Sequence, residues 1–132
     1  MATAPRKNGF TLIELLIAMV LVAILATIGV NRFWSVKDRG LETSVKSDLR
    51  EFASQQEDYF QFNYNYAADP ASIPDYVNSP GVSVTVTYSG IDGWAATAAH
   101  SSLTGKNCGI LIGNAPAASA PPATSPGLIE CN

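Results

Sequence analysis

The chain has 132 residues, of which 47% are hydrophobic and only 14% are charged, and its formal net charge is −3. This length accommodates one small domain. The charged fraction is low for a soluble globular protein, which indicates a chain that meets a membrane or packs heavily against partners. Removing residues 1–9 takes away Arg6 and Lys7 and makes the net charge −5. A protein with this charge and no basic cluster is a poor candidate for direct nucleic-acid binding by phosphate neutralisation.

The hydrophobic residues gather in one run, residues 10–30. As an α-helix rising about 1.5 Å per residue, the run spans roughly the 30 Å hydrocarbon core of a bilayer. Arg6 and Lys7 precede the run and predict a cytoplasmic N-terminus, although the asymmetry is small because Arg32 and Lys37 follow it. A conventional secretory signal peptide fits badly, since the run is too long and no small-x-small cleavage site follows it.

One carboxylate, Glu14, interrupts the apolar run near its start. A charged side chain at bilayer depth costs about 2.5–3.5 kcal/mol on insertion scales and therefore indicates a functional role. The simpler interpretation is an interfacial glutamate that snorkels or stays protonated, in a first helical turn whose dipole favours an acid. Neither interpretation explains the residues around Glu14.

Residues 9–18, Gly-Phe-Thr-Leu-Ile-Glu-Leu-Leu-Ile-Ala, closely resemble the processing site of type IV prepilins and related pseudopilins, and the resemblance extends through the helix to about residue 60. It implies a leader of residues 1–9, cleavage after Gly9 by the prepilin peptidase, and N-methylation of the new N-terminal residue, Phe10. It also implies that Glu14 pairs with the Phe10 amine of a neighbouring subunit and thereby sets the register of a filament.

The function implied by this resemblance is that of a structural subunit of a type IV pilus, polymerising through its hydrophobic helix for adhesion, twitching motility or DNA uptake. The implied partners are further copies of the chain in a helical homopolymer, the prepilin peptidase, and the pilus assembly machinery with its minor pilins. The precursor is expected in the inner membrane, with its C-terminal domain in the periplasm, and the mature chain in the extracellular pilus. Two alternatives are a type II secretion pseudopilin and a single-pass anchored domain that never polymerises.

The helical pattern continues beyond the apolar run, and residues 31–66 are expected to form the amphipathic half of the same helix. Leu41, Val45 and Leu49 recur at four-residue spacing, as on one face of a helix. In pilin filaments the stretch corresponding to Gly29 is often locally unwound, and Gly weakens a helix interior. Unwinding near this residue is therefore an open alternative to an unbroken helix.

Residues 67–132 are expected to form a small C-terminal domain. Alternating valines predict a strand at residues 82–88, and further strand signals fall at residues 94–100 and 108–112. The expected fold is therefore α+β, with a long helix packed on a small antiparallel sheet. Residues 114–127 are rich in Pro and Ala, and we expect this low-complexity loop not to form a core.

Cys108 and Cys131 are the two cysteines of the chain. They are too few and too far apart for a CxxC metal site. In an exported protein the simplest interpretation is one disulfide, and two free buried thiols are the alternative. A disulfide-bounded C-terminal loop is common in pilins. Closing a loop of about 20 residues in this way contributes about 3 kcal/mol.

Residues that carry catalytic chemistry are sparse in the sequence. His100 has no cysteine or acidic cluster near it in sequence, and the sequence has no Gly-rich phosphate loop. Neither an enzyme, a cofactor nor a metal is therefore expected. Asp92 and Glu130 are too few for the calcium site that major pseudopilins often carry. The aromatic residues from Phe33 to Tyr66 are expected to serve core and inter-subunit packing, with electron conduction as an alternative.

Overall fold

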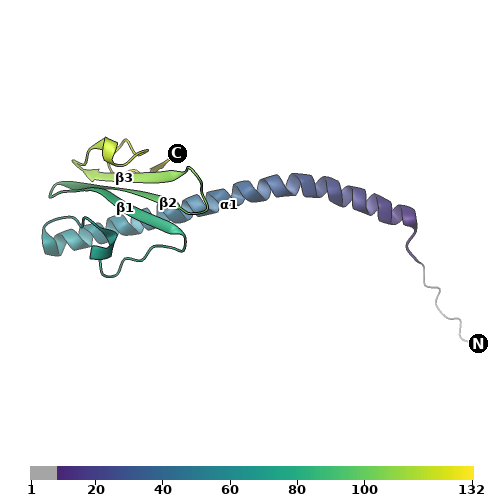
Figure 1. The fold of residues 1–132 in the computed structure, drawn as a ribbon, viewed down its shortest axis with the longest axis horizontal. Helices are drawn as coiled ribbons and strands as arrows, with labels where there is room; N and C mark the ends of the chain where they lie inside the picture. The colour runs from purple at the N-terminus through teal and green to yellow at the C-terminus, as the bar shows by residue number, and fades with distance from the viewer. Residues whose placement is uncertain (1–8) are drawn as a thin grey trace, which may run out of the picture. The chain divides into compact units, whose positions relative to one another are not determined.

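The computed structural model describes residues 9–132, so the expected leader lies outside the described residues except for Gly9. One long helix is followed by a four-stranded antiparallel sheet, which confirms the expected α+β fold (Figure 1). The helix is α1 (Leu12–Asn63), and the strands are β1 (Val82–Ser89), β2 (Gly93–His100), β3 (Asn107–Gly113) and β4 (Glu130–Cys131). Two short 3-10 helices, η1 (Pro70–Ser72) and η2 (Ala117–Ser119), lie in the connections.

The contacts divide the chain into two compact units, with the boundary between Lys37 and Asp38 inside α1. We call the described residues 9–37 the N-terminal unit and residues 38–132 the C-terminal unit. No interruption of α1 is recorded near Gly29, so the described helix is unbroken at this position.

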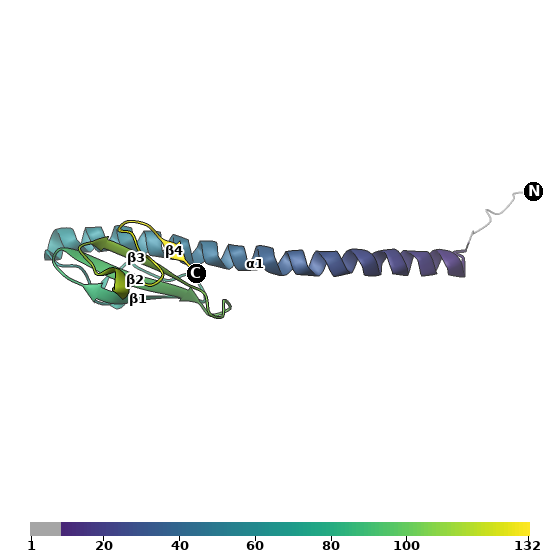
Figure 2. The ribbon, with the colours of Figure 1, turned by 90° about the horizontal axis from the view of Figure 1, so that it is seen from above.

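The C-terminal unit has its main core between α1 and one face of the sheet. Val45, Leu49 and Phe52 are at most 2% exposed, and their spacing of four and three residues places them on one helical face. This face packs against Trp94 of β2 and Ile110 of β3, which are also buried. Figure 2 shows β1, β2 and β3 side by side along the C-terminal part of α1. The amphipathic pattern in the sequence therefore predicted the packing face of the helix correctly.

The other face of the sheet is covered by residues 114–127, which we call the covering loop. Ala115, Ala120 and Ala123 of this loop are buried and pack with Ala95 and Leu111 of the sheet. The expectation that the loop forms no core was therefore wrong. Alanine is small enough to let a loop lie almost directly on a strand, so this core layer carries no strong hydrophobic signal in the sequence.

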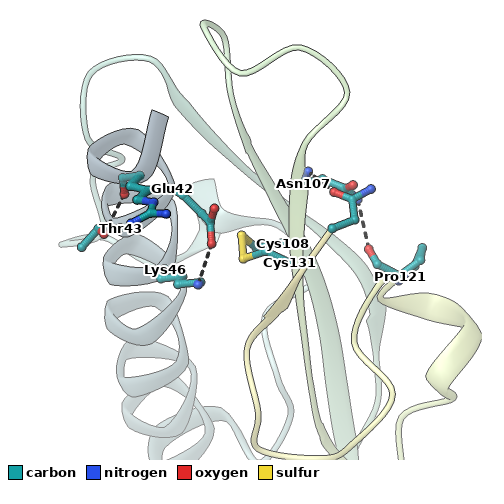
Figure 3. The surroundings of a disulfide bond; sticks show 9 residues. Glu42, Thr43, Lys46, Asn107, Cys108, Pro121 and Cys131 are labelled. Carbon is teal, nitrogen blue, oxygen red and sulfur yellow. Dashed lines mark hydrogen bonds and ion pairs between the residues drawn. A yellow bond between two sulfur atoms is a disulfide. The ribbon is translucent and has the colours of Figure 1, made fainter. Parts of the chain in front are cut away.

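Gly109 of β3 makes this close approach possible. A Cβ atom at this position would collide with the carbonyl oxygen of Ala120, which is backbone and cannot rotate away. Beside it, Nδ2 of Asn107 donates a hydrogen bond to the carbonyl oxygen of Pro121 at 3.0 Å (Figure 3). The covering loop is thus held on the sheet by direct contacts as well as by its ends.

Cys108 and Cys131 form the expected disulfide. The bridge joins β3 to β4, whose two residues pair with Cys108 and Gly109. Figure 3 shows the sulfur atoms facing the part of α1 that carries Glu42 and Lys46. The Lys46 ammonium lies 2.7 Å from the Glu42 carboxylate, and this hydrogen bond holds the pKa of Glu42 below its usual range.

Two buried polar side chains fix the connection between α1 and β1. The Gln56 side chain is fully buried, donates to the carbonyl oxygen of Ala67 at 2.9 Å and accepts from its amide at 2.8 Å. The Asp48 carboxylate accepts hydrogen bonds from the amide and the hydroxyl of Ser79, both at 2.7 Å. Because buried polar groups are costly without partners, these contacts tie the connection to the helix.

Candidate processing and assembly site

The sequence motif at the start of α1 forms a reciprocal set of hydrogen bonds. Oε2 of Glu14 accepts from the Thr11 amide at 2.9 Å and from the Thr11 hydroxyl at 2.8 Å. The Thr11 hydroxyl oxygen in turn accepts from the Glu14 amide at 3.3 Å. Thr11 directly precedes the helix and Glu14 is the third helical residue, so the pair is a capping box. Thr11 was not among the predicted site residues, although a threonine three residues before a glutamate is the signature of such a box.

The capping box occupies one of the two carboxylate oxygens of Glu14. Both hydrogen bonds from Thr11 go to Oε2, and within residues 9–132 no hydrogen bond to Oε1 is recorded. The described chain also contains no hydrogen bond between Glu14 and Phe10. The two residues named together in the sequence analysis are therefore not paired within one subunit, and Glu14 keeps an oxygen that a further donor can reach.

Gly9 and Phe10 precede the helix and have no regular secondary structure. The Phe10 side chain is 86% exposed, and no atom outside its immediate chain neighbours lies within 4 Å of the position of a Cβ on Gly9. The bond between them is therefore accessible, and nothing in the described chain requires glycine at position 9. If glycine is needed here, the requirement lies in the enzyme that binds this segment.

The surface that follows is apolar on all sides. Every large hydrophobic side chain between Phe10 and Val30 is more than half exposed, and Val20 is the most covered of them at 51%. Among the described residues, α1 is long and apolar enough to cross a membrane, as judged by length and composition. A continuous apolar surface of this size is not stable in water and marks an interaction with a bilayer or with protein.

Outside this region, the described residues contain no group of three His, Cys, Asp or Glu side chains arranged to hold a metal ion. His100 is buried at the end of β2, where its Nδ1 accepts a hydrogen bond from the Ser102 amide at 3.0 Å. This contact gives the histidine a structural role in the turn after the strand. The candidate functional site is therefore the start of α1 and the apolar surface that follows it.

One compact unit contains a capped, fully exposed apolar helix, and the other contains a small disulfide-linked sheet. These features define a class of proteins whose N-terminal helix binds a membrane or other protein chains. The family model described as the prokaryotic N-terminal methylation motif matches residues 4–30. The chain is 33% identical over 63 residues to the type IV major pilin protein PilA of Myxococcus xanthus, covering 48% of this chain and 29% of the relative. It is 35% identical over 66 residues to the type IV wide pilus major component PilA4 of Thermus thermophilus, half of each chain.

A third relative is the type II secretion system core protein G of Pseudomonas aeruginosa, 29% identical over 75 residues, which covers 57% of this chain and 53% of the relative. The chain spans about half of the length of the relatives it matches, or less. The chain therefore resembles type IV pilins in its N-terminal methylation motif and over about half of its length. Two of these relatives are named as a pilin and a pilus component, and the third is named as a core protein of a secretion system.

Proposed function

We propose that this chain is a structural subunit of a type IV pilus that polymerises through its apolar helix. The observation that carries the proposal is that the helix bearing the methylation motif exposes large apolar side chains on every side. A single-pass anchor needs such a surface only against lipid. A helix that leaves the bilayer for the middle of a filament needs it against many neighbouring subunits, which replace the lipid on all sides.

The proposed processing removes residues 1–9 and methylates Phe10. The exposed, irregular backbone at Gly9 and Phe10 supports this step, because a peptidase must bind its substrate in an extended form. In the proposed division of the chain, residues 10–30 are the assembly segment, whose helix begins at Leu12. Residues 31–66 contain the amphipathic continuation, which ends at Asn63, and residues 67–132 form the C-terminal domain. The precursor would lie in the inner membrane with its N-terminus in the cytoplasm and its C-terminal domain in the periplasm.

The proposed assembly contact joins Glu14 of one subunit to the Phe10 amine of the next. Oε2 of Glu14 already accepts two hydrogen bonds from Thr11, and Oε1 remains for the incoming amine. The pair would give each of two charged groups a partner in an apolar filament core, where an unpaired charge is strongly unfavourable. The further partners are the prepilin peptidase, which would act on the motif, and the assembly machinery with its minor pilins.

The capping box changes how this contact must be tested, because it gives Glu14 a role even in a simple membrane anchor. Glu14→Gln keeps an acceptor at the third helical position, where glutamine also forms capping boxes, but removes the negative charge. Thr11→Val removes the box and keeps the charge. The two variants therefore separate helix capping from charge pairing.

We expect Glu14→Gln to leave insertion into the membrane intact and to abolish filaments in the material sheared from the cell surface. Thr11→Val should retain filaments at a reduced amount, since the loss of one helix cap costs about 1 kcal/mol. The amounts in the membrane and sheared fractions are compared by immunoblot of each. Filaments at the normal level in Glu14→Gln would contradict the proposed pairing. If the unmodified chain and both variants are found in equal amounts in the membrane fraction and none is sheared from the surface, the chain is a simple anchor.

A type II secretion pseudopilin is the second candidate, favoured by the similarity to core protein G. Both candidates share the processed N-terminus and the apolar helix, so the location of the mature chain separates them. A pilus subunit is recovered from the cell surface by shearing. A pseudopilin would be processed at Phe10 and remain in the envelope.

A further inference from the structure

The end of the apolar surface that lies farthest from Glu14 carries a cluster of aromatic and basic side chains. Phe33 and Trp34 are 65% and 54% exposed, and their rings meet edge to face with centroids 5.9 Å apart. The Lys37 ammonium lies 5.1 Å from the Trp34 ring centroid, within the range of a cation–π contact. Arg32 completes the cluster, which we call the aromatic–basic belt (residues 32, 33, 34 and 37).

The belt lies at a distance from Glu14 that matches the thickness of a bilayer. At 1.5 Å per residue, Glu14 and Trp34 are separated by about 30 Å along the helix, which equals the usual hydrocarbon thickness. Both polar ends of the apolar surface can therefore reach a membrane–water interface at the same time. Tryptophan prefers this interface because its ring is apolar and its N–H needs a hydrogen-bond partner.

The charges of the belt fit the headgroup side of that interface. Arg32 and Lys37 bring two positive charges to the end of the membrane segment, next to one negative charge at Asp38, and neither is in the ion pair recorded among residues 9–132. Each basic residue near an anionic membrane surface contributes about 1 kcal/mol of attraction. Lys37 reaches the Trp34 ring from one turn further along the same helical face, so the cation and the aromatic ring act at one place.

We propose that the aromatic–basic belt is a lipid-binding surface that fixes the depth of the unassembled subunit in the bilayer and binds anionic phospholipid headgroups. This inference rests on the proposed function, since it applies to the membrane-inserted precursor. Assembly into a filament would have to remove Trp34 and Lys37 from their headgroup contacts. The belt thereby sets part of the free energy that extraction from the membrane requires.

The depth of Trp34 can be measured directly, because the chain has two tryptophans and Trp94 is fully buried in the C-terminal unit. The full chain is reconstituted into vesicles of phosphatidylcholine and phosphatidylglycerol, and the spectrum of Trp34→Phe is subtracted to isolate Trp34. Lipids carrying bromine either near the glycerol or near the end of the acyl chain quench the fluorescence. We expect the shallow bromines to remove the larger part of the Trp34 signal and the deep bromines to leave most of it.

Three outcomes of the depth measurement would overturn the inference. Stronger quenching by the deep bromines would place Trp34 inside the hydrocarbon, and a floating chain that neither lipid quenches would place it in water. If quenching disappears as more chains are added to each vesicle, the aromatic–basic belt binds a second subunit instead of lipid. A chain that fails to float with the vesicles would contradict the proposed function itself. This result is distinct from the three outcomes above, in which the chain floats but the belt does not bind headgroups.

The preference for anionic lipid is tested by energy transfer from Trp34 to dansyl-labelled phosphatidylglycerol, relative to dansyl-labelled phosphatidylcholine. We expect Lys37→Gln to lower this preference about fivefold, which corresponds to about 1 kcal/mol per basic residue. Lys106→Gln is the matched control, because Lys106 is an exposed lysine of the C-terminal unit. An equal preference in the two variants would overturn the headgroup assignment.

Discussion

Reduction of the Cys108–Cys131 disulfide should lower the free energy of unfolding of the C-terminal unit by about 3 kcal/mol. The bridge closes a chain segment with a sequence separation of 23 residues. The loss of loop entropy in the unfolded chain predicts a stabilisation of about 3 kcal/mol for a segment of this length. Since small domains are stable by only about 5–15 kcal/mol, this is a large fraction of the total.

Reduction is a better perturbation than substitution here, because it keeps both sulfur atoms and so leaves the packing of buried Cys108 largely unchanged. The assay is chemical denaturation of the full chain in detergent micelles, followed by Trp94 fluorescence in a Trp34→Phe background. Oxidised and reduced samples are compared at one pH and temperature. A difference below about 1 kcal/mol would refute the entropic reasoning and show that packing of Ala115, Ala120 and Ala123 holds the covering loop in both chains.

Three further predictions concern the same unit. Gly109→Ala should destabilise it by about 1–3 kcal/mol in the same denaturation assay, because the new Cβ meets a backbone oxygen of the covering loop. Gly40→Ala is the contrasting variant, with open space at its Cβ in the middle of α1, and should stabilise the helix by about 0.5–1 kcal/mol. Burial, and then the charge of Asp48, raises the pKa of Tyr76 above its usual range. The folded chain therefore holds this proton more tightly, so the contribution of Tyr76 to stability should be constant below about pH 10 and be lost above it. Tyr76→Phe should flatten that alkaline decline, and an identical decline in both chains would contradict the assignment.

The elements with strong periodicity were predictable from the sequence. The four-residue spacing of Val45 and Leu49 predicted the buried face of α1, and alternating valines predicted β1. The strands at Gly93–His100 and Asn107–Gly113 extend the expected ranges by one residue at one or both ends. These signals survive because helix and strand periods are set by backbone geometry.

What the sequence did not predict depends on contacts between distant residues. The strand β4 has two residues and pairs only where the disulfide brings it to β3, so it has no pattern of its own. In the sequence, the alanines of the covering loop resemble those of a disordered spacer. They are buried because Gly109 has no Cβ and lets the loop lie directly on the sheet. Tertiary packing, rather than local preference, determines both features.

At the candidate site the sequence supplied the residues but not their local arrangement. Glu14 was expected to serve a neighbouring subunit, and the structure adds that Thr11 already binds one of its carboxylate oxygens. The roles of Gly9 and Phe10 in cleavage and methylation stay predictions, because they depend on an enzyme and a membrane that act on this segment.

The most direct test of the account is mass spectrometry of filaments sheared from the surface of the source cells. If the chain is processed after Gly9 and assembled into a pilus, we expect abundant chains whose N-terminal peptide begins at methylated Phe10. In these chains Cys108 and Cys131 are linked, with the mass lowered by two hydrogens. Chains that keep residues 1–9 and stay in the membrane fraction would contradict the account.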